Sequence, residues 1–158
     1  MFPPLAIKQH ITHDLPFFLA KKVAWVPFRL QGLVLETALQ QVFSEALRDG
    51  DLDFLENHTI RISIDDLNLS WYFSCRNQRI KVHKQSQAST TIRGKLEEFI
   101  RLVARYEDPD TLFFQRRLII EGNTEVGLEM KNLLDSLDPD CLPLPIRKSI
   151  DLAVKVFI

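Results

Sequence analysis

The chain has 158 residues, of which 46% are hydrophobic and 26% charged, and its formal net charge is -1. This length suits one domain, and the composition excludes a disordered chain. The near-zero charge excludes a global basic field, so we expect no nucleic-acid partner.

Cysteine usage and the N-terminus indicate the compartment. Cys75 and Cys141 lie far apart without a CxxC spacing, which favours free thiols in a reducing cytoplasm. The start of the chain lacks the order of a signal peptide, and no apolar run approaches the roughly 20 residues that span a bilayer. We therefore expect a cytoplasmic protein whose contact with the inner membrane is at most peripheral.

The first 30 residues are predicted to form an N-terminal arm and an apolar helix. Residues 1–15 show little periodicity, whereas residues 16–28, PFFLAKKVAWVPF, are apolar nearly all round. A helix of this kind is either buried in a core or packed against a partner or a lipid surface. The candidate membrane contacts are Phe17, Phe18, Lys21, Lys22 and Trp25.

The next segment changes from helical to strand periodicity. Apolar residues from Leu35 to Ala46 follow helical spacing and predict a helix over residues 31–49, ended by Gly50. Alternating residues then predict strands at 60–64, 69–75 and 79–83, with a hairpin turn at Asn77, and a weaker strand at 88–93.

The second half of the chain returns to helical spacing. We expect a helix over residues 96–104, a short helix over 111–115, a strand over 117–121 and a helix capped by Asn123. A last amphipathic helix follows the prolines at 139–145. This order predicts an α+β fold: a five-stranded, mostly antiparallel sheet with helices gathered on one face.

Candidate sites for directed polar chemistry are weak. The turn GNTEVG, residues 122–127, matches no phosphate-binding fingerprint, and Glu121 and Glu125 would repel a phosphate. His10 and His13 have only Asp14 nearby, so we expect no metal site. The chain also lacks a recognisable nucleophile motif. We therefore predict no catalytic residues, no cofactor and no enzymatic activity.

Apolar bulk is the more informative signal. Eleven phenylalanines against two tyrosines bring rings without hydrogen-bonding groups, and Phe113 and Phe114 lie between a turn and a strand. A ligand cavity could be enclosed by these rings together with one face of the sheet and an amphipathic helix. A filled core is the alternative, and periodicity does not distinguish the two.

Two segments of the second half resemble a known family. ASTTIRGKLEEFIRLV and EDPDTLFFQRRLIIEGNTEVGLEMKNLL are similar to the C-terminal half of the sterol carrier protein type 2 lipid-binding domain. The resemblance extends in order of elements from about Leu35 to Leu137, which indicates a lipid-binding domain at 31–138 and a C-terminal helix at 139–158. The runs DPDTLFFQRRLIIEG and RDGDLDFLENHTIRISIDDLNLSWYFS are closest to the branch of this family that serves ubiquinone biosynthesis.

The resemblance implies a non-enzymatic accessory protein of oxygen-independent ubiquinone biosynthesis. A hydrophobic tunnel between sheet and helices would hold the polyprenyl tail of a quinone precursor, or a phospholipid, beside hydroxylases that carry iron–sulfur clusters. Within this picture, Phe113 and Phe114 are candidates for the mouth of the tunnel. Arg116 and Arg117 stand where the family usually begins its last strand with a glycine, and either one is a candidate for contact with the head group. The expected tunnel walls are Trp71, Phe73, Leu118, Ile120, Val126, Met130 and Leu134.

Two other functions stay open from the sequence. One is a general carrier of phospholipid or other lipids. The other is a protein-interaction scaffold with a filled interior and no bound ligand.

Overall fold

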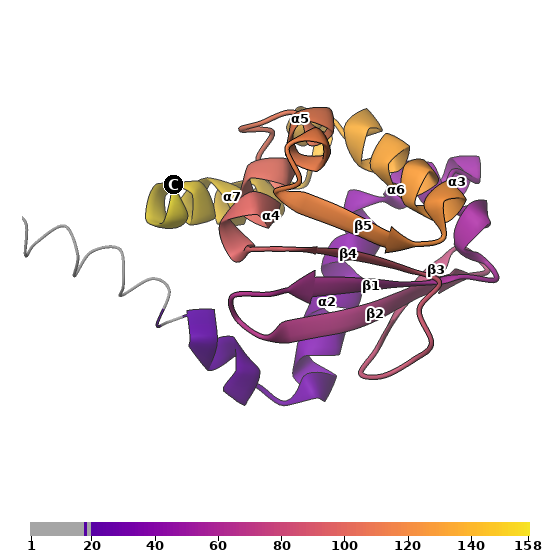
Figure 1. The fold of residues 1–158 in the computed structure, drawn as a ribbon, viewed down its shortest axis with the longest axis horizontal. Coiled ribbons are helices and arrows are strands. Elements are labelled where there is room, and N and C mark those ends of the chain that lie inside the picture. Colours follow the sequence, from indigo (N-terminus) through magenta and orange to yellow (C-terminus); the bar gives the residue numbers. More distant parts are fainter. Residues whose placement is uncertain (1–17, 19) are drawn as a thin grey trace, which may run out of the picture.

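Five strands form one mixed sheet in the computed structural model, which describes residue 18 and residues 20–158. The strands are β1 (Thr59–Ile64), β2 (Leu69–Arg76), β3 (Arg79–His83), β4 (Thr90–Gly94) and β5 (Leu118–Gly122). Their spatial order is β3-β2-β1-β4-β5 (Figure 1). Strands β1 and β4 are parallel, and the other neighbouring pairs are antiparallel. The predicted α+β class with a mostly antiparallel sheet is confirmed.

Helices precede, interrupt and follow the strands. The α-helices are α2 (Phe28–Val42), α3 (Ser44–Asp49), α4 (Leu96–Val103), α5 (Pro109–Phe114), α6 (Thr124–Ser136) and α7 (Leu144–Phe157). Short 3-10 helices are η1 (Lys22–Trp25), η2 (Asp53–Leu55) and η3 (Pro139–Cys141). In Figure 1, α2 crosses behind the strands, and α3, α5 and α6 lie above them.

Two helix boundaries differ from the prediction. Helix α2 begins directly after Pro27, so the predicted break between residues 30 and 31 falls inside a helix. The chain then leaves helical geometry at Phe43, with φ -98 and ψ 17, and restarts as α3. Proline fixes its own φ and fits just ahead of a helix, which explains why Pro27 starts this helix. The described part of the predicted helix over 16–28 is instead a short helical turn leading into η1.

The strand register gathers apolar side chains on one face of the sheet. Ile62 of β1 lies opposite Trp71 of β2 and Ile92 of β4. Because side chains alternate along a strand, the same face carries most of the apolar residues of the five strands, and the other face carries residues such as Arg61 and Arg93. Helices α2 and α6 pack against the sheet at β3 and at β4 and β5, respectively, and cover the apolar face.

The predicted turn and cap residues have the expected geometry. Asn77 and Gln78 both have positive φ, 52° and 61°, which is the two-residue turn preferred in hairpins. Gly50 ends α3 in the left-handed conformation. The side chain of Asn123 accepts hydrogen bonds from the backbone N–H groups of Glu125 and Val126, at 3.0 and 3.2 Å, and caps α6.

Helix α2 also covers the edge strand β3. The N–H group of Ile80 donates to Gln40 Oε1 at 3.0 Å, and that of Val82 donates to Glu36 Oε1 at 2.9 Å. Both amides face away from β2 and would otherwise offer hydrogen bonds to another strand. Two side chains of one helix therefore close this edge.

Two glycine substitutions should change stability in opposite directions. Gly122→Ala should lower the free energy of unfolding by about 1–3 kcal/mol, because Gly122 has φ +96° and an added Cβ would lie 2.4 Å from the carbonyl oxygen of Ser89. Gly32→Ala should raise it by about 0.5–1 kcal/mol, since its Cβ would meet Phe28 and Val82 only at 3.9 and 4.0 Å. Urea denaturation measures both, and equal effects would contradict this account.

Candidate functional site

An apolar cavity of about 220 Å³ lies between the apolar face of the sheet and helices α2, α4 and α6; we call it the inner cavity. Its lining is apolar or sulfur-bearing except for Ser74. Cavities with such walls stay dry and accept apolar molecules. The lining side chains are Leu35, Leu39, Phe43, Leu52, Leu55, Ile60, Ile62, Trp71, Phe73, Cys75, Ile80, Ile92, Phe99, Leu102, Val103, Met130 and Leu134.

The predicted tunnel walls divide into two groups. Trp71, Phe73, Met130 and Leu134 line the inner cavity. Leu118, Ile120 and Val126 instead belong to the packed core around it: Leu118 and Val126 are buried, and Ile120 is partly buried. The contributions of α2 and of the turn at η2 were not predicted, because their periodicity is the same for a filled core and for a cavity wall.

Cys75 lines the inner cavity as a thiol. Burial raises the pKa of the Cys75 thiol, and the nearby carboxylates of Glu56 and Asp53 raise it further. The thiolate, which is the reactive form, is therefore disfavoured. Cys75 therefore contributes a small, mostly neutral thiol to the wall of the inner cavity.

A second apolar space of about 540 Å³, the outer groove, opens beyond one end of the inner cavity. Helix α7 forms one wall and α4 another, and the turn between β1 and β2 forms the floor. Trp71 is the residue that lines both spaces. The outer groove is lined by Ala20, Val23, Ile64, Leu67, Leu69, Trp71, Leu96, Ile100, Ser149, Leu152, Ala153, Val156 and Phe157.

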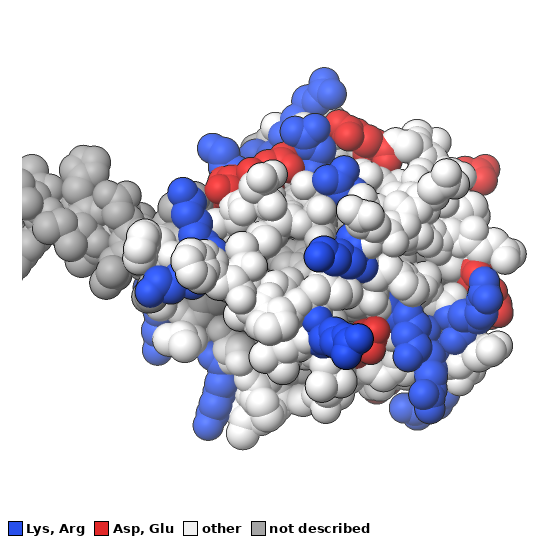
Figure 2. All heavy atoms as spheres, turned by 90° about the horizontal axis from the view of Figure 1, so that it is seen from below, with Lys and Arg blue, Asp and Glu red and all other residues white. Residues whose placement is uncertain are grey.

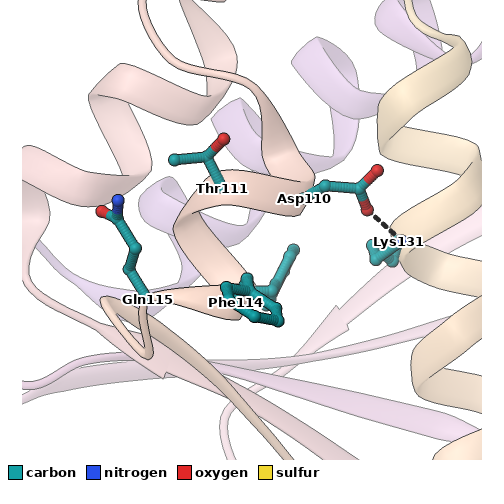
Figure 3. A pocket seen from close by; sticks show the side chains of 6 residues that line it. Asp110, Thr111, Phe114, Gln115 and Lys131 are labelled. Atoms are coloured by element: carbon teal, nitrogen blue, oxygen red, sulfur yellow. Dashed lines mark hydrogen bonds and ion pairs between the residues drawn. The ribbon is translucent and has the colours of Figure 1, made fainter.

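The two phenylalanines predicted at the mouth lie on a different part of the surface. Phe114 is 90% exposed, and Phe113 is partly buried against the core. Both line an open hollow of about 610 Å³ on α5 and α6, where Asp110 forms an ion pair with Lys131 (Figure 3). This hollow shares no lining residue with the inner cavity, so the mouth at Phe113 and Phe114 stays a prediction.

The two arginines predicted at a head group differ sharply in their surroundings. Arg117 forms ion pairs with Glu98, at 2.7 Å, and with Glu107. Hydrogen bonds to these carboxylates raise the pKa of Arg117, and Arg117 in turn lowers the pKa of Glu107. Glu107 also pairs with Arg101 at 3.2 Å. Arg117 therefore ties α4 and the following loop to the start of β5.

The side chain of Arg116 forms no hydrogen bond or ion pair with the residues that the structure describes, whereas its backbone N–H donates to the oxygen of Phe113 at 3.1 Å. Its backbone has a positive φ of 58°, and its side chain lines a hollow of about 490 Å³ together with Lys95 and Arg117. This hollow also shares no residue with the inner cavity, so the head-group contact of either arginine stays a prediction.

The predicted membrane contacts are exposed where the structure describes them. Phe17 lies outside the described residues. Phe18 is 60% and Trp25 is 88% exposed, and the ammonium group of Lys22 lies 5.4 Å from the centre of the Phe18 ring. Helix α2 adds an exposed apolar stripe that was not predicted, although its spacing of three and four residues could have indicated it. We call the whole surface the N-terminal patch: Phe18, Trp25, Leu30, Leu33 and Val34.

Figure 2 views the molecule from the side on which η1 and the start of α2 lie in Figure 1. Lys and Arg are more numerous there than Asp and Glu, and broad uncharged areas separate them. Such a surface combines apolar contact with attraction to anions without forming one continuous basic stripe.

The described residues contain neither a metal cluster nor a membrane-spanning helix. No group of three or more His, Cys, Asp and Glu side chains among the described residues is placed to hold a metal ion. None of the helices between residues 20 and 158 combines the length and apolar character that crossing a bilayer requires. His10 and His13 lie outside the described residues.

Known proteins are similar to this chain in sequence and in fold. Residues 35–135 match the model of the SCP-2 sterol transfer family. The chain is 40% identical over 141 residues to the ubiquinone biosynthesis accessory factor UbiT of Escherichia coli K12, which covers 89% of this chain and 81% of that protein. The solved structure of UbiJ-SCP2, a ubiquinone synthesis protein, aligns with a TM-score of 0.57 at 17% identity over 69% of this chain and 97% of that one. The resemblance seen in the sequence is confirmed.

The adjacent arginines allow a matched test of the ion pairs. Arg117→Gln should lower the melting temperature at neutral pH by about 2–4 °C, and Arg116→Gln should leave it unchanged. The pKa of Glu107 is lowered in the folded protein, so its contribution is present at neutral pH and is lost as the pH falls through that lowered value. The melting temperatures of the two variants should therefore converge as the pH falls from neutral to well below the ordinary pKa of a glutamate, about 4.3. Calorimetry across this range measures the difference, and a constant gap would refute the role of Glu107.

Proposed function

Because the chain belongs to the SCP-2 sterol transfer family, we propose that it is a lipid-binding accessory protein of ubiquinone biosynthesis. The inner cavity takes apolar carbons from the polyprenyl tail of a quinone precursor or from a phospholipid. The observation that carries this proposal is an apolar cavity between sheet and helices in a chain 40% identical to a ubiquinone biosynthesis accessory factor.

Sheathing a lipid tail is a task that apolar walls can perform alone. Removing apolar surface from water stabilises a complex by about 25 cal/mol per Å², so burying several hundred Å² of a tail contributes roughly 10 kcal/mol before the costs of binding. Met130 suits such a wall, since its unbranched thioether side chain adapts to ligands of different shape.

A non-enzymatic role is consistent with a site that binds only the apolar tail of a lipid. The inner cavity brings together side chains that bind apolar groups, and its one thiol is held in the unreactive form. Chemistry on the head group then belongs to partner enzymes. Following the resemblance, we assign these partners to the oxygen-independent pathway, as hydroxylases that carry iron–sulfur clusters.

The N-terminal patch is the proposed site of peripheral contact with a membrane. Exposed aromatic and aliphatic side chains gather there beside Lys22 and Arg29, and such a surface lies favourably at the boundary between head groups and acyl chains. A carrier that exchanges lipid with a bilayer needs a contact of this kind.

The same patch favours a second candidate function, a protein-interaction scaffold. Apolar surfaces on soluble proteins often mark binding sites for other proteins. A scaffold would keep the N-terminal patch and leave the inner cavity without a ligand. Native mass spectrometry of the protein, purified from cells that make quinone precursors, distinguishes the two because only the carrier retains a lipid mass.

Filling the inner cavity should abolish lipid retention. Met130→Trp adds bulk inside the cavity, and we expect at least about tenfold less co-purified lipid, since apolar overpacking leaves little room for a chain. Leu128→Trp, on the exposed side of the same helix, is the matched control and should retain lipid at the level of the unmodified protein. Undiminished lipid in a folded Met130→Trp protein would overturn the assignment of this cavity.

Trp25 should matter for membrane contact more than an equally exposed ring elsewhere. Trp25→Ser should weaken binding to vesicles with anionic head groups about tenfold, because an interfacial indole contributes on the order of 1–2 kcal/mol. Phe114→Ser removes an exposed ring on α5, which lies above the sheet in Figure 1 whereas η1 lies below it, and should have no effect. Vesicle flotation measures both, and equal losses would rule out the N-terminal patch as the contact.

A further inference from the structure

The inner cavity and the outer groove follow one another along the same two strands. On β2, Cys75 and Phe73 line the inner cavity, and Leu69 lines the outer groove. On β1, Ile62 lines the inner cavity and Ile64 lines the outer groove. Trp71 sits at the boundary and lines both spaces. Its ring is buried, so it separates two apolar compartments that the sheet would otherwise join.

The inner cavity alone is too small for a long lipid chain. A cavity of about 150 Å³ accommodates one benzene molecule, so 220 Å³ holds roughly nine carbon atoms, or about two isoprene units. The outer groove, at about 540 Å³, offers more room beyond Trp71. From Cys75 to Leu69 the two spaces extend along roughly 20 Å of strand, at about 3.3 Å per residue.

The Trp71 ring is held by one side chain. Its indole N–H donates to Gln31 Oε1 at 2.9 Å, and Gln31 Nε2 donates to the backbone oxygens of Val23, at 2.9 Å, and Val26, at 2.8 Å. An indole N–H only donates and a backbone oxygen only accepts, so one orientation of the amide satisfies all three bonds. Gln31 therefore links the ring to the segment around η1.

We propose that the inner cavity and the outer groove form one composite site for a single long isoprenoid chain, and that Trp71, held by Gln31, determines which chain lengths enter. This inference rests on the proposed lipid-binding function and deepens it. A short chain fills the inner cavity with the ring in place. A longer chain displaces the ring, and its far end lies in the outer groove against α7.

Two isoprenoid probes with a photoreactive diazirine at the far end test the path of the chain. One has about two isoprene units, matched to the inner cavity, and the other has about four. After irradiation, peptide mapping of the full chain should place the short probe on the peptide that contains Met130 and the long probe on α7. If the long probe labels only the lining of the inner cavity, the composite site is wrong while lipid binding stands. If neither probe binds, the proposed function fails as well.

Two variants test the control by Trp71. Trp71→Phe keeps an aromatic ring without the hydrogen bond, and Gln31→Leu removes its acceptor. Both should speed uptake of the long probe about fivefold to tenfold, the effect of one lost hydrogen bond. Gln31→Leu leaves every lining residue of the inner cavity in place and should leave uptake of the short probe unchanged, whereas Trp71→Phe should change uptake of the short probe less than that of the long one.

Gln40→Leu is the matched control on the same helix. Gln40 also bridges two backbone groups, the oxygen of Gln78 at 2.8 Å and the N–H of Ile80 at 3.0 Å, but these lie at β3. It should change uptake of neither probe. If Gln31→Leu and Trp71→Phe alter both probes equally, or match Gln40→Leu, Trp71 does not select chain length.

Discussion

The parallel pairing of β1 with β4 is the constraint on which the rest of the structure depends. It joins the β1–β2–β3 meander to the β4–β5 pair in a register that sets Ile62 beside Ile92. With this register, most of the apolar residues of the five strands share one face, which helices must cover to exclude water. Helices from both halves of the chain supply this cover. The inner cavity lies between this apolar face and the helices that cover it.

Much of this fold could be predicted from the sequence, because strand alternation and turn chemistry are local. Local sequence alone is enough to predict the strand from Ile60 to Ile64, the turn at Asn77 and the helix cap at Asn123. The interruption at Phe43 could not be predicted, since the apolar stripe continues through it without a break. The start of α2 was also not predicted, because a proline such as Pro27 is found both after the end of one helix and just before the start of the next.

The candidate site was predictable only in part, for a different reason. A wall residue and a core residue have the same spacing and the same chemistry, so Met130 and Val126 look alike until the helix is placed on the sheet. Charged residues raise a similar difficulty. Arg116 and Arg117 are neighbours of identical type, and only the fold brings Glu98 and Glu107 to one of them.

The closed edge at β3 affects how the protein meets other chains. Glu36 and Gln40 already occupy the outward amides of Val82 and Ile80, so a second polypeptide arriving there finds no donors for strand addition. An open edge strand would let copies of a chain pair edge to edge and polymerise. On β3 the protection comes from two polar side chains of α2, Glu36 and Gln40. Contact with other chains is thereby directed away from the β3 edge and toward side-chain surfaces.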